Sequence, residues 1–163
     1  MEDLTGGCHC GNIRIDVALS GQAATMTPRA CDCDFCHKHG AAYISDPDGR
    51  LAVAVEDETL LRRYRQGSQT AEMLVCGNCG ILVGAVFRAG DEIFGTVNVR
   101  ALAPQAAFGD SQTASPKLLE TDEKIDRWKA LWFRCVTFAT SAPQPDDSGA
   151  LRADPAPTKQ GGA

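Results

Sequence analysis

The sequence predicts a mainly β fold with zinc knuckles and one helix near its C-terminal end. Short segments that alternate apolar and polar residues are separated by turn signals, which is typical of a sandwich or a barrel-like fold. Seven of the eight cysteines lie in three short groups, and this clustering indicates metal-binding loops. Residues 120–132 instead place apolar side chains at helical spacing, which predicts an amphipathic helix packed on the sheet.

The first predicted strand covers residues 12–19, where apolar and polar side chains alternate without a break. Cys8 and Cys10 lead into it, and in an extended segment their spacing would place both thiols on one side and His9 on the other. Residues 41–45 and 51–55 predict two further strands. Because Asp-Pro-Asp-Gly lies between them, we expect them to form a hairpin.

The central part of the chain predicts more strands around a second cysteine pair. Residues 60–65 fit either a strand or a short helix. Residues 70–75 and 81–87 predict two strands, with Cys-Gly-Asn-Cys-Gly at 76–80 on the hairpin tip and its two glycines supplying backbone freedom. Residues 93–99 alternate again and predict another strand.

The C-terminal part changes in character. Residues 106–115 are small and polar and predict a loop, and the two tryptophans of the helix at 120–132 are expected in the core or at an interface. Cys135 fits a buried small apolar residue. We therefore expect a zinc-binding domain at 1–140 and a disordered tail at 141–163, which is rich in Pro, Gly, Ala and Asp.

Composition restricts the possible partners. A net charge of −5 and a pI near 5.1 argue against nucleic acid or an anionic membrane as the main partner. The N-terminal residues show no signal-peptide pattern, and no apolar run approaches the length of a membrane span. We expect a cytoplasmic protein with reduced thiols, in which paired cysteines bind metal or do redox chemistry rather than form disulfides.

The first and last cysteine groups fit one closed metal site. Two thiols separated by two residues in a tight turn can meet tetrahedral zinc geometry, although one CxxC alone could equally be a redox pair. A second pair, distant in sequence, favours a structural zinc that ties the N-terminal strand to the central hairpin. Its predicted ligands are Cys8, Cys10, Cys76 and Cys79.

The middle group supplies three thiolates from one loop, and its predicted ligands are Cys31, Cys33 and Cys36. A second closed site would need a histidine as its fourth ligand, and the candidates are His9, His37 and His39. In the other interpretation, water or an incoming thiol takes the fourth position. Zinc holds a bound thiol as thiolate near neutral pH, which suits chemistry on a small thiol.

Charged residues beside the middle group have open roles. Asp32 and Asp34 fit hydrogen-bond acceptors beside the metal, acid–base groups or solvated loop carboxylates. Arg29 and Lys38 are candidates to receive a substrate carboxylate.

Together the three groups, with their glycines at 7–11, 31–40 and 76–80, resemble the glutathione-dependent formaldehyde-activating enzyme family, which includes centromere protein V. The resemblance covers residues 6–102. It implies a β-tent of packed antiparallel sheets, two zinc ions per chain and a catalytic-type zinc on the middle group. Residues 113–131 depart from the family pattern, because they contain no histidine and look helical.

By this resemblance we expect a carbon–sulfur lyase that acts on adducts of glutathione, or a related thiol, with formaldehyde or another small aldehyde. The alternative is a non-enzymatic binding or scaffold module of the same fold in which both zinc ions are structural. A redox or metal-buffering protein is a third possibility. The absence of a basic extension argues against a chromatin or microtubule role.

Overall fold

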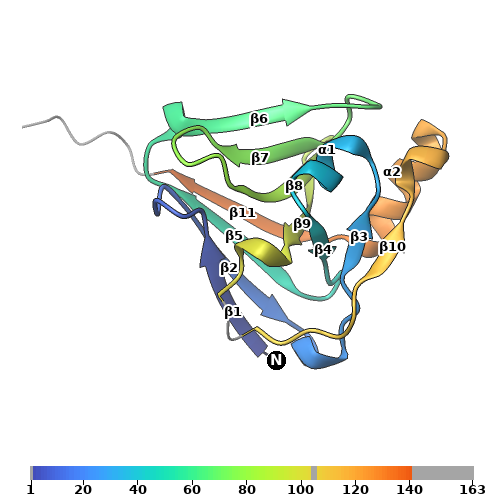
Figure 1. The fold of residues 1–163 in the computed structure, drawn as a ribbon, viewed down its shortest axis with the longest axis horizontal. Coiled ribbons are helices and arrows are strands. Elements are labelled where there is room, and N and C mark those ends of the chain that lie inside the picture. The colour runs from blue at the N-terminus through green and yellow to red at the C-terminus, as the bar shows by residue number, and fades with distance from the viewer. Residues whose placement is uncertain (1, 104–105, 141–163) are drawn as a thin grey trace, which may run out of the picture.

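Two β-sheets form the body of the protein, as the computed structural model of residues 2–103 and 106–140 shows (Figure 1). The smaller sheet has the order β1 (Glu2–Gly7), β2 (Ile13–Leu19), β5 (Arg50–Val55) and β11 (Cys135–Thr140). The larger sheet has the order β10 (Gln112–Ala114), β3 (Arg29–Cys31), β4 (Ala42–Ile44), β9 (Glu92–Asn98), β8 (Leu82–Ala89), β7 (Glu72–Cys76) and β6 (Leu61–Arg65). The predicted mainly β class is confirmed, and the predicted tail at 141–163 lies outside the described residues.

Most neighbouring strands run antiparallel, and each sheet ends in one strand that pairs in parallel. These two edge strands are β10, which pairs with β3, and β11, which pairs with β5. Both come from the C-terminal part of the chain and were not predicted. β10 lies within residues 106–115, which were expected to form a loop, and no strand was expected at β11. Short 3₁₀ helices lie at Ala23–Thr25, Glu58–Leu60, Val99–Ala101 and Pro116–Leu118.

The predicted hairpin of residues 41–45 and 51–55 is wrong, although both segments are strands. β4 belongs to the larger sheet, whereas β5 belongs to the smaller one and pairs with β2. The turn between them changes sheets, and Asp46 anchors it by accepting hydrogen bonds from the Ser20 backbone N–H (2.7 Å) and hydroxyl (2.8 Å). Side-chain alternation identifies a strand but does not reveal which strand it pairs with, so the expected pairing of these two strands was wrong.

The centre of the larger sheet is buried on both faces, and β8 shows this most clearly. Val83 and Val86 join the core between the two sheets, while Leu82, Ala85 and Phe87 join a second core on the opposite face. This explains the continuous apolar sequence of β8, because a strand covered on both sides has no solvent-facing position.

The second core is completed by α2 (Thr121–Leu131), as predicted from helical spacing. Glu120 and Glu123 form a capping box at its first turn, which satisfies backbone N–H groups that a helix otherwise leaves unpaired. Trp132 is buried and stacks on the half-buried Trp128 with ring centroids 5.1 Å apart. None of the helices within the described residues is long and apolar enough to cross a membrane.

Candidate metal centres and ligand cavity

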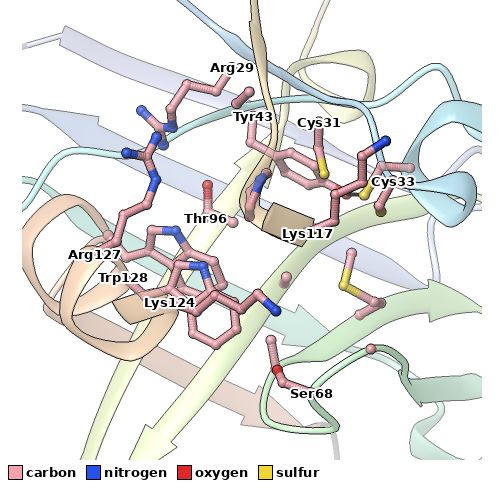
Figure 2. A pocket seen from close by; sticks show the side chains of 18 of the residues that line it. Arg29, Cys31, Cys33, Tyr43, Ser68, Thr96, Lys117, Lys124, Arg127 and Trp128 are labelled. Atoms are coloured by element: carbon pink, nitrogen blue, oxygen red, sulfur yellow. Dashed lines mark hydrogen bonds between the residues drawn. The ribbon is translucent and has the colours of Figure 1, made fainter. Parts of the chain in front are cut away.

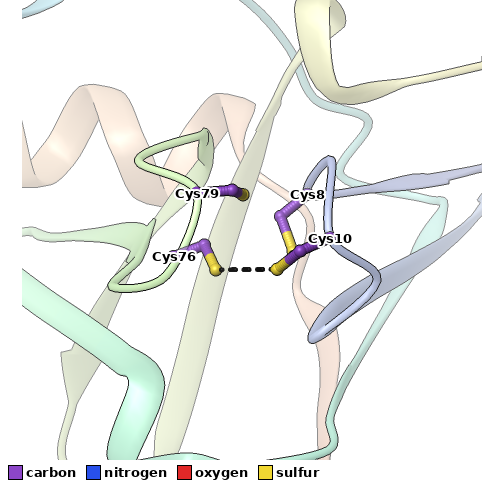
Figure 3. A group of neighbouring side chains, drawn as sticks. All are labelled: Cys8, Cys10, Cys76 and Cys79. Carbon is purple, nitrogen blue, oxygen red and sulfur yellow. Dashed lines mark hydrogen bonds between the residues drawn. The ribbon is translucent and has the colours of Figure 1, made fainter. Parts of the chain in front are cut away.

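Four thiols from two loops meet where the two sheets approach each other (Figure 3). Cys8 and Cys10 lie between β1 and β2, Cys76 ends β7, and Cys79 lies in the turn between β7 and β8. The Cys10 sulfur is 3.7 Å from that of Cys8 and 3.5 Å from that of Cys76. Tetrahedral zinc with bonds of about 2.3 Å requires sulfur atoms about 3.8 Å apart. The four-thiol group, defined as these cysteines, therefore fits one metal ion that joins both sheets.

Local backbone geometry explains how these loops present their sulfur atoms. Cys8 and Cys10 do not lie in an extended segment as predicted, because the chain turns tightly after β1. Gly11 and Gly80, each directly after the second cysteine of its pair, have φ values of +83° and +76°, which favour glycine. The Ile13 backbone N–H donates to the Cys8 sulfur at 3.1 Å, a bond that suits a metal-bound thiolate.

The three-thiol group lies on the other face of the larger sheet and comprises Cys31, Cys33 and Cys36, whose sulfur atoms are within 4.8 Å of one another. Cys31 ends β3, and Cys33 and Cys36 come from the start and the interior of α1 (Asp34–Lys38), a short helix that was not predicted. Among the described residues, no histidine or carboxylate joins these three thiols.

The histidines lie elsewhere. His9 and His37 are exposed, and the His39 ring packs against Phe35 with centroids 4.6 Å apart. Each imidazole that the sequence analysis considered as a fourth ligand is therefore absent from the three-thiol group within the part of the chain that the structure describes.

Hydrogen-bond donors surround the three-thiol group. The Tyr43 hydroxyl is 3.2 Å from the Cys36 sulfur, and the Gln66 amide nitrogen is 3.6 Å from the Cys33 sulfur. Burial raises the pKa of Tyr43, so this hydroxyl keeps its proton and can donate it to sulfur. A hydrogen bond from Cys36 lowers the pKa of Cys31 to about 6, and the same hydrogen bond together with burial raises the pKa of Cys36.

A cavity of about 220 Å³ opens beside the three-thiol group, between the larger sheet and α2 (Figure 2). Met73, Ala85 and Thr96 from the sheet and Trp128 and Trp132 on the helix side give it a largely apolar lining. Figure 2 shows Cys31 and Cys33 on one side of this space and the guanidinium groups of Arg29 and Arg127 on another.

Four cationic side chains line the same cavity: Arg29, Lys117, Lys124 and Arg127. Lys117 forms an ion pair with Asp32 at 3.2 Å, and Asp32 also accepts a hydrogen bond from Ser115 at 2.8 Å. The Ser115 hydroxyl and Lys117 hold the pKa of Asp32 below its ordinary value, so Asp32 anchors the segment after β10 to the cysteine loop. Asp34 and Lys38 are exposed and do not line the cavity.

Arg29 was among the candidates predicted from the sequence, whereas Lys117, Lys124 and Arg127 were not. Burial and the nearby charge of Arg127 lower the pKa of Arg29. Arg127 and Lys124 occupy the polar side of an amphipathic helix, where charged residues usually contact solvent. They line the cavity only because of the way α2 packs on the sheet, and this packing cannot be predicted from the local sequence.

One family model and one solved structure are similar to this chain. A family model described as glutathione-dependent formaldehyde-activating enzyme matches residues 3–116, a range that contains both thiol groups. A crystal structure of a Rhodobacter sphaeroides protein is 32% identical, and the match covers 66% of this chain and 99% of that chain with a TM-score of 0.46. The family match ends before α2 begins.

Proposed function

The chain belongs to the glutathione-dependent formaldehyde-activating enzyme family, and from this premise we propose that it is a zinc-dependent carbon–sulfur lyase. Its substrates are adducts of glutathione, or a related thiol, with formaldehyde or another small aldehyde. The observation that supports this proposal is the three-thiol group, which faces a cavity and has no fourth protein ligand among the described residues. A metal site with an open position is the kind that does chemistry.

The thiol groups of the chain fit two zinc ions with different roles. The four-thiol group would hold a structural ion, and Cys31, Cys33 and Cys36 would hold the second. When bound there, zinc would keep a substrate thiol in its thiolate form near neutral pH. A cytoplasmic location, where thiols stay reduced, suits both groups.

The surrounding residues prepare the cavity for addition of sulfur to a carbonyl carbon. Tyr43 and Gln66 donate toward cysteine sulfur atoms and so stabilise their negative charge. Trp128 and Trp132 form an apolar wall on the helix side of the cavity. In the reaction, a carbon–sulfur bond forms, the thiol proton leaves to solvent and the carbonyl oxygen gains a proton. The reverse reaction breaks this bond and releases the thiol and the aldehyde.

The alternative, a binding module in which both zinc ions are structural, requires a fourth protein ligand at the three-thiol group. It requires a histidine as fourth ligand, and the three histidines of the chain lie outside the three-thiol group in the described structure. This placement favours the enzyme over the binding module.

The proposal is tested by exchange NMR with ¹³C-formaldehyde and a thiol panel of glutathione, cysteine and 2-mercaptoethanol. We expect the zinc-loaded protein to accelerate formation and breakdown of the hydroxymethyl adduct of at least one thiol, and metal-free protein to leave the spontaneous rate unchanged. Exchange at the spontaneous rate with every thiol in the panel would contradict the proposed activity.

A further inference from the structure

Two guanidinium groups share one side of the cavity although their charges repel. Arg29 is half-buried on β3, and Arg127 extends from α2 toward it (Figure 2). Arg29 donates a hydrogen bond to the Ser45 hydroxyl, which fixes its orientation. Within the described residues, neither arginine forms an ion pair with a carboxylate. A pair of like charges held together in this way is stabilised when an anion binds between them.

The charge balance of the cavity points in the same direction. Of the four cations that line it, only Lys117 has an acidic partner, and none of the described lining residues carries a carboxylate. The chain as a whole has a net charge of −5, so this local excess of positive charge is not a property of the overall composition. A cavity lined by one sign of charge attracts ligands of the opposite sign. It offers no carboxylate to a ligand's ammonium group.

We propose that Arg29 and Arg127 bind a carboxylate of the thiol substrate while its sulfur lies at the three-thiol group. The identity of the sulfur end rests on the function proposed above, whereas the anion site rests on the two arginines themselves. The planar guanidinium group matches the geometry of a carboxylate and binds it through two parallel hydrogen bonds. The substrate is thus an acidic thiol, and neutral thiols bind more weakly.

This assignment gives α2 a role in specificity. The helix lies outside the matched family region, yet it supplies Arg127, Lys124 and Trp128 to the cavity. Because Arg127 reaches the cavity from a solvent-exposed position, it can be changed without opening the core. Arg127 is therefore the better residue for a test than the half-buried Arg29.

The test measures binding through the tryptophan fluorescence of the zinc-loaded protein, since Trp128 lines the cavity. The probes are S-methylglutathione, which has no thiol to contact a metal, and its dimethyl ester, which lacks both carboxylate charges. The variants are Arg127→Gln and, as a matched control, Lys129→Gln, which removes one exposed positive charge from the same helix away from the cavity.

We expect Arg127→Gln to raise the Kd of S-methylglutathione at least about tenfold, the effect of losing a charged hydrogen bond. It should leave the Kd of the ester within about twofold, and Lys129→Gln should change neither. Equal affinity of acid and ester for the native protein, no measurable binding of S-methylglutathione, or an equal loss of both ligands in Arg127→Gln would each overturn the anion site.

These outcomes are separable from failure of the proposed activity. If no thiol exchange is accelerated but S-methylglutathione binds in an Arg127-dependent manner, the anion site stands and the lyase function does not. If 2-mercaptoethanol exchanges as efficiently as glutathione in both the native protein and Arg127→Gln, the lyase function stands and the carboxylate site does not.

Discussion

The two thiol groups contain similar residues but belong to different parts of the molecule. The four-thiol group joins loops of both sheets, and its buried members Cys8 and Cys76 are part of the core between them. The three-thiol group comes from one short stretch, the end of β3 and α1, and its buried member Cys36 belongs to the second core under α2. The first group therefore connects the two layers of the fold, whereas the second faces a cavity lined by cations and aromatic rings.

With the function proposed above, stability and chemistry are divided between the two cores. A metal ion at the four-thiol group would hold the sheets together and contribute directly to folding. A metal ion at the three-thiol group would crosslink only residues that are already neighbours in sequence, so its contribution to folding is smaller. The two groups should then respond differently to the same substitution.

The largest effect is expected for Cys76→Ser, which removes a fully buried thiol from the four-thiol group. We expect loss of one zinc ion and a decrease of more than about 4 kcal/mol in the free energy of unfolding, because both the metal and the link between sheets are lost. Zinc analysis and urea denaturation of the purified variant measure the two quantities. If Cys76→Ser lost one zinc ion but kept the wild-type free energy of unfolding, the four-thiol group would not be structural.

A smaller effect on stability, but a complete loss of thiol exchange, is expected for Cys33→Ser. The zinc content should fall from two ions to one, while the free energy of unfolding changes by about 1 kcal/mol or less, as for most substitutions at half-exposed sites. Cys135→Ser is the control, since this thiol is exposed on β11 and outside both groups. If Cys33→Ser unfolds as readily as Cys76→Ser, both groups are structural.

The smallest effect is expected at Asp46, whose contribution to stability depends on pH independently of the metal sites. Burial alone would raise the pKa of Asp46, but hydrogen bonds from Ser20 and from the Asp48 N–H (3.0 Å) hold that pKa below its ordinary value. The stabilisation is therefore complete above about pH 4, the ordinary aspartate pKa, and is lost as the pH falls through the lower folded-state value.

The test of Asp46 compares the wild type with Asp46→Asn by urea denaturation between pH 7 and pH 3. Because Asp46 is outside both thiol groups, the difference between the two proteins at each pH excludes acid release of metal. We expect a difference of about 1 to 2 kcal/mol at pH 7 that shrinks below pH 4. A difference that stays constant down to pH 3 would contradict this role of the Asp46 charge.

The cysteine groups and most of the central strands could be predicted from the sequence, because ligand spacing and side-chain alternation are visible within a few consecutive residues. The hairpin CxxC was placed correctly for this reason, as β7 and β8 are consecutive and antiparallel. The pairing of strands that are far apart in the sequence could not be predicted in this way. β11 pairs with β5 across about half the chain, and Cys135, predicted to be buried, is exposed on that strand.

The cavity shows the same limit at the candidate site. Cys31, Cys33 and Cys36 could be recognised from their spacing alone, since all three lie within six consecutive residues. Arg127, which faces them from α2, looks like any charged residue on a solvated helix until the helix is docked on the sheet. Tyr43 and Gln66 also reach the thiols only through tertiary folding, from segments with no sign of such a role.

The sequence separation of the thiols also sets an order of events during synthesis. Cys10 and Cys76 are 66 residues apart, so a ribosome adding 5 to 20 residues per second needs about 3 to 13 s between them. The three-thiol group is complete within a six-residue stretch that emerges well before Cys76. A nascent chain would therefore complete its three-thiol group first and its four-thiol group last. If zinc is scarce, the three-thiol group would bind the first ion, and a second ion would be needed before the four-thiol group could join the two sheets.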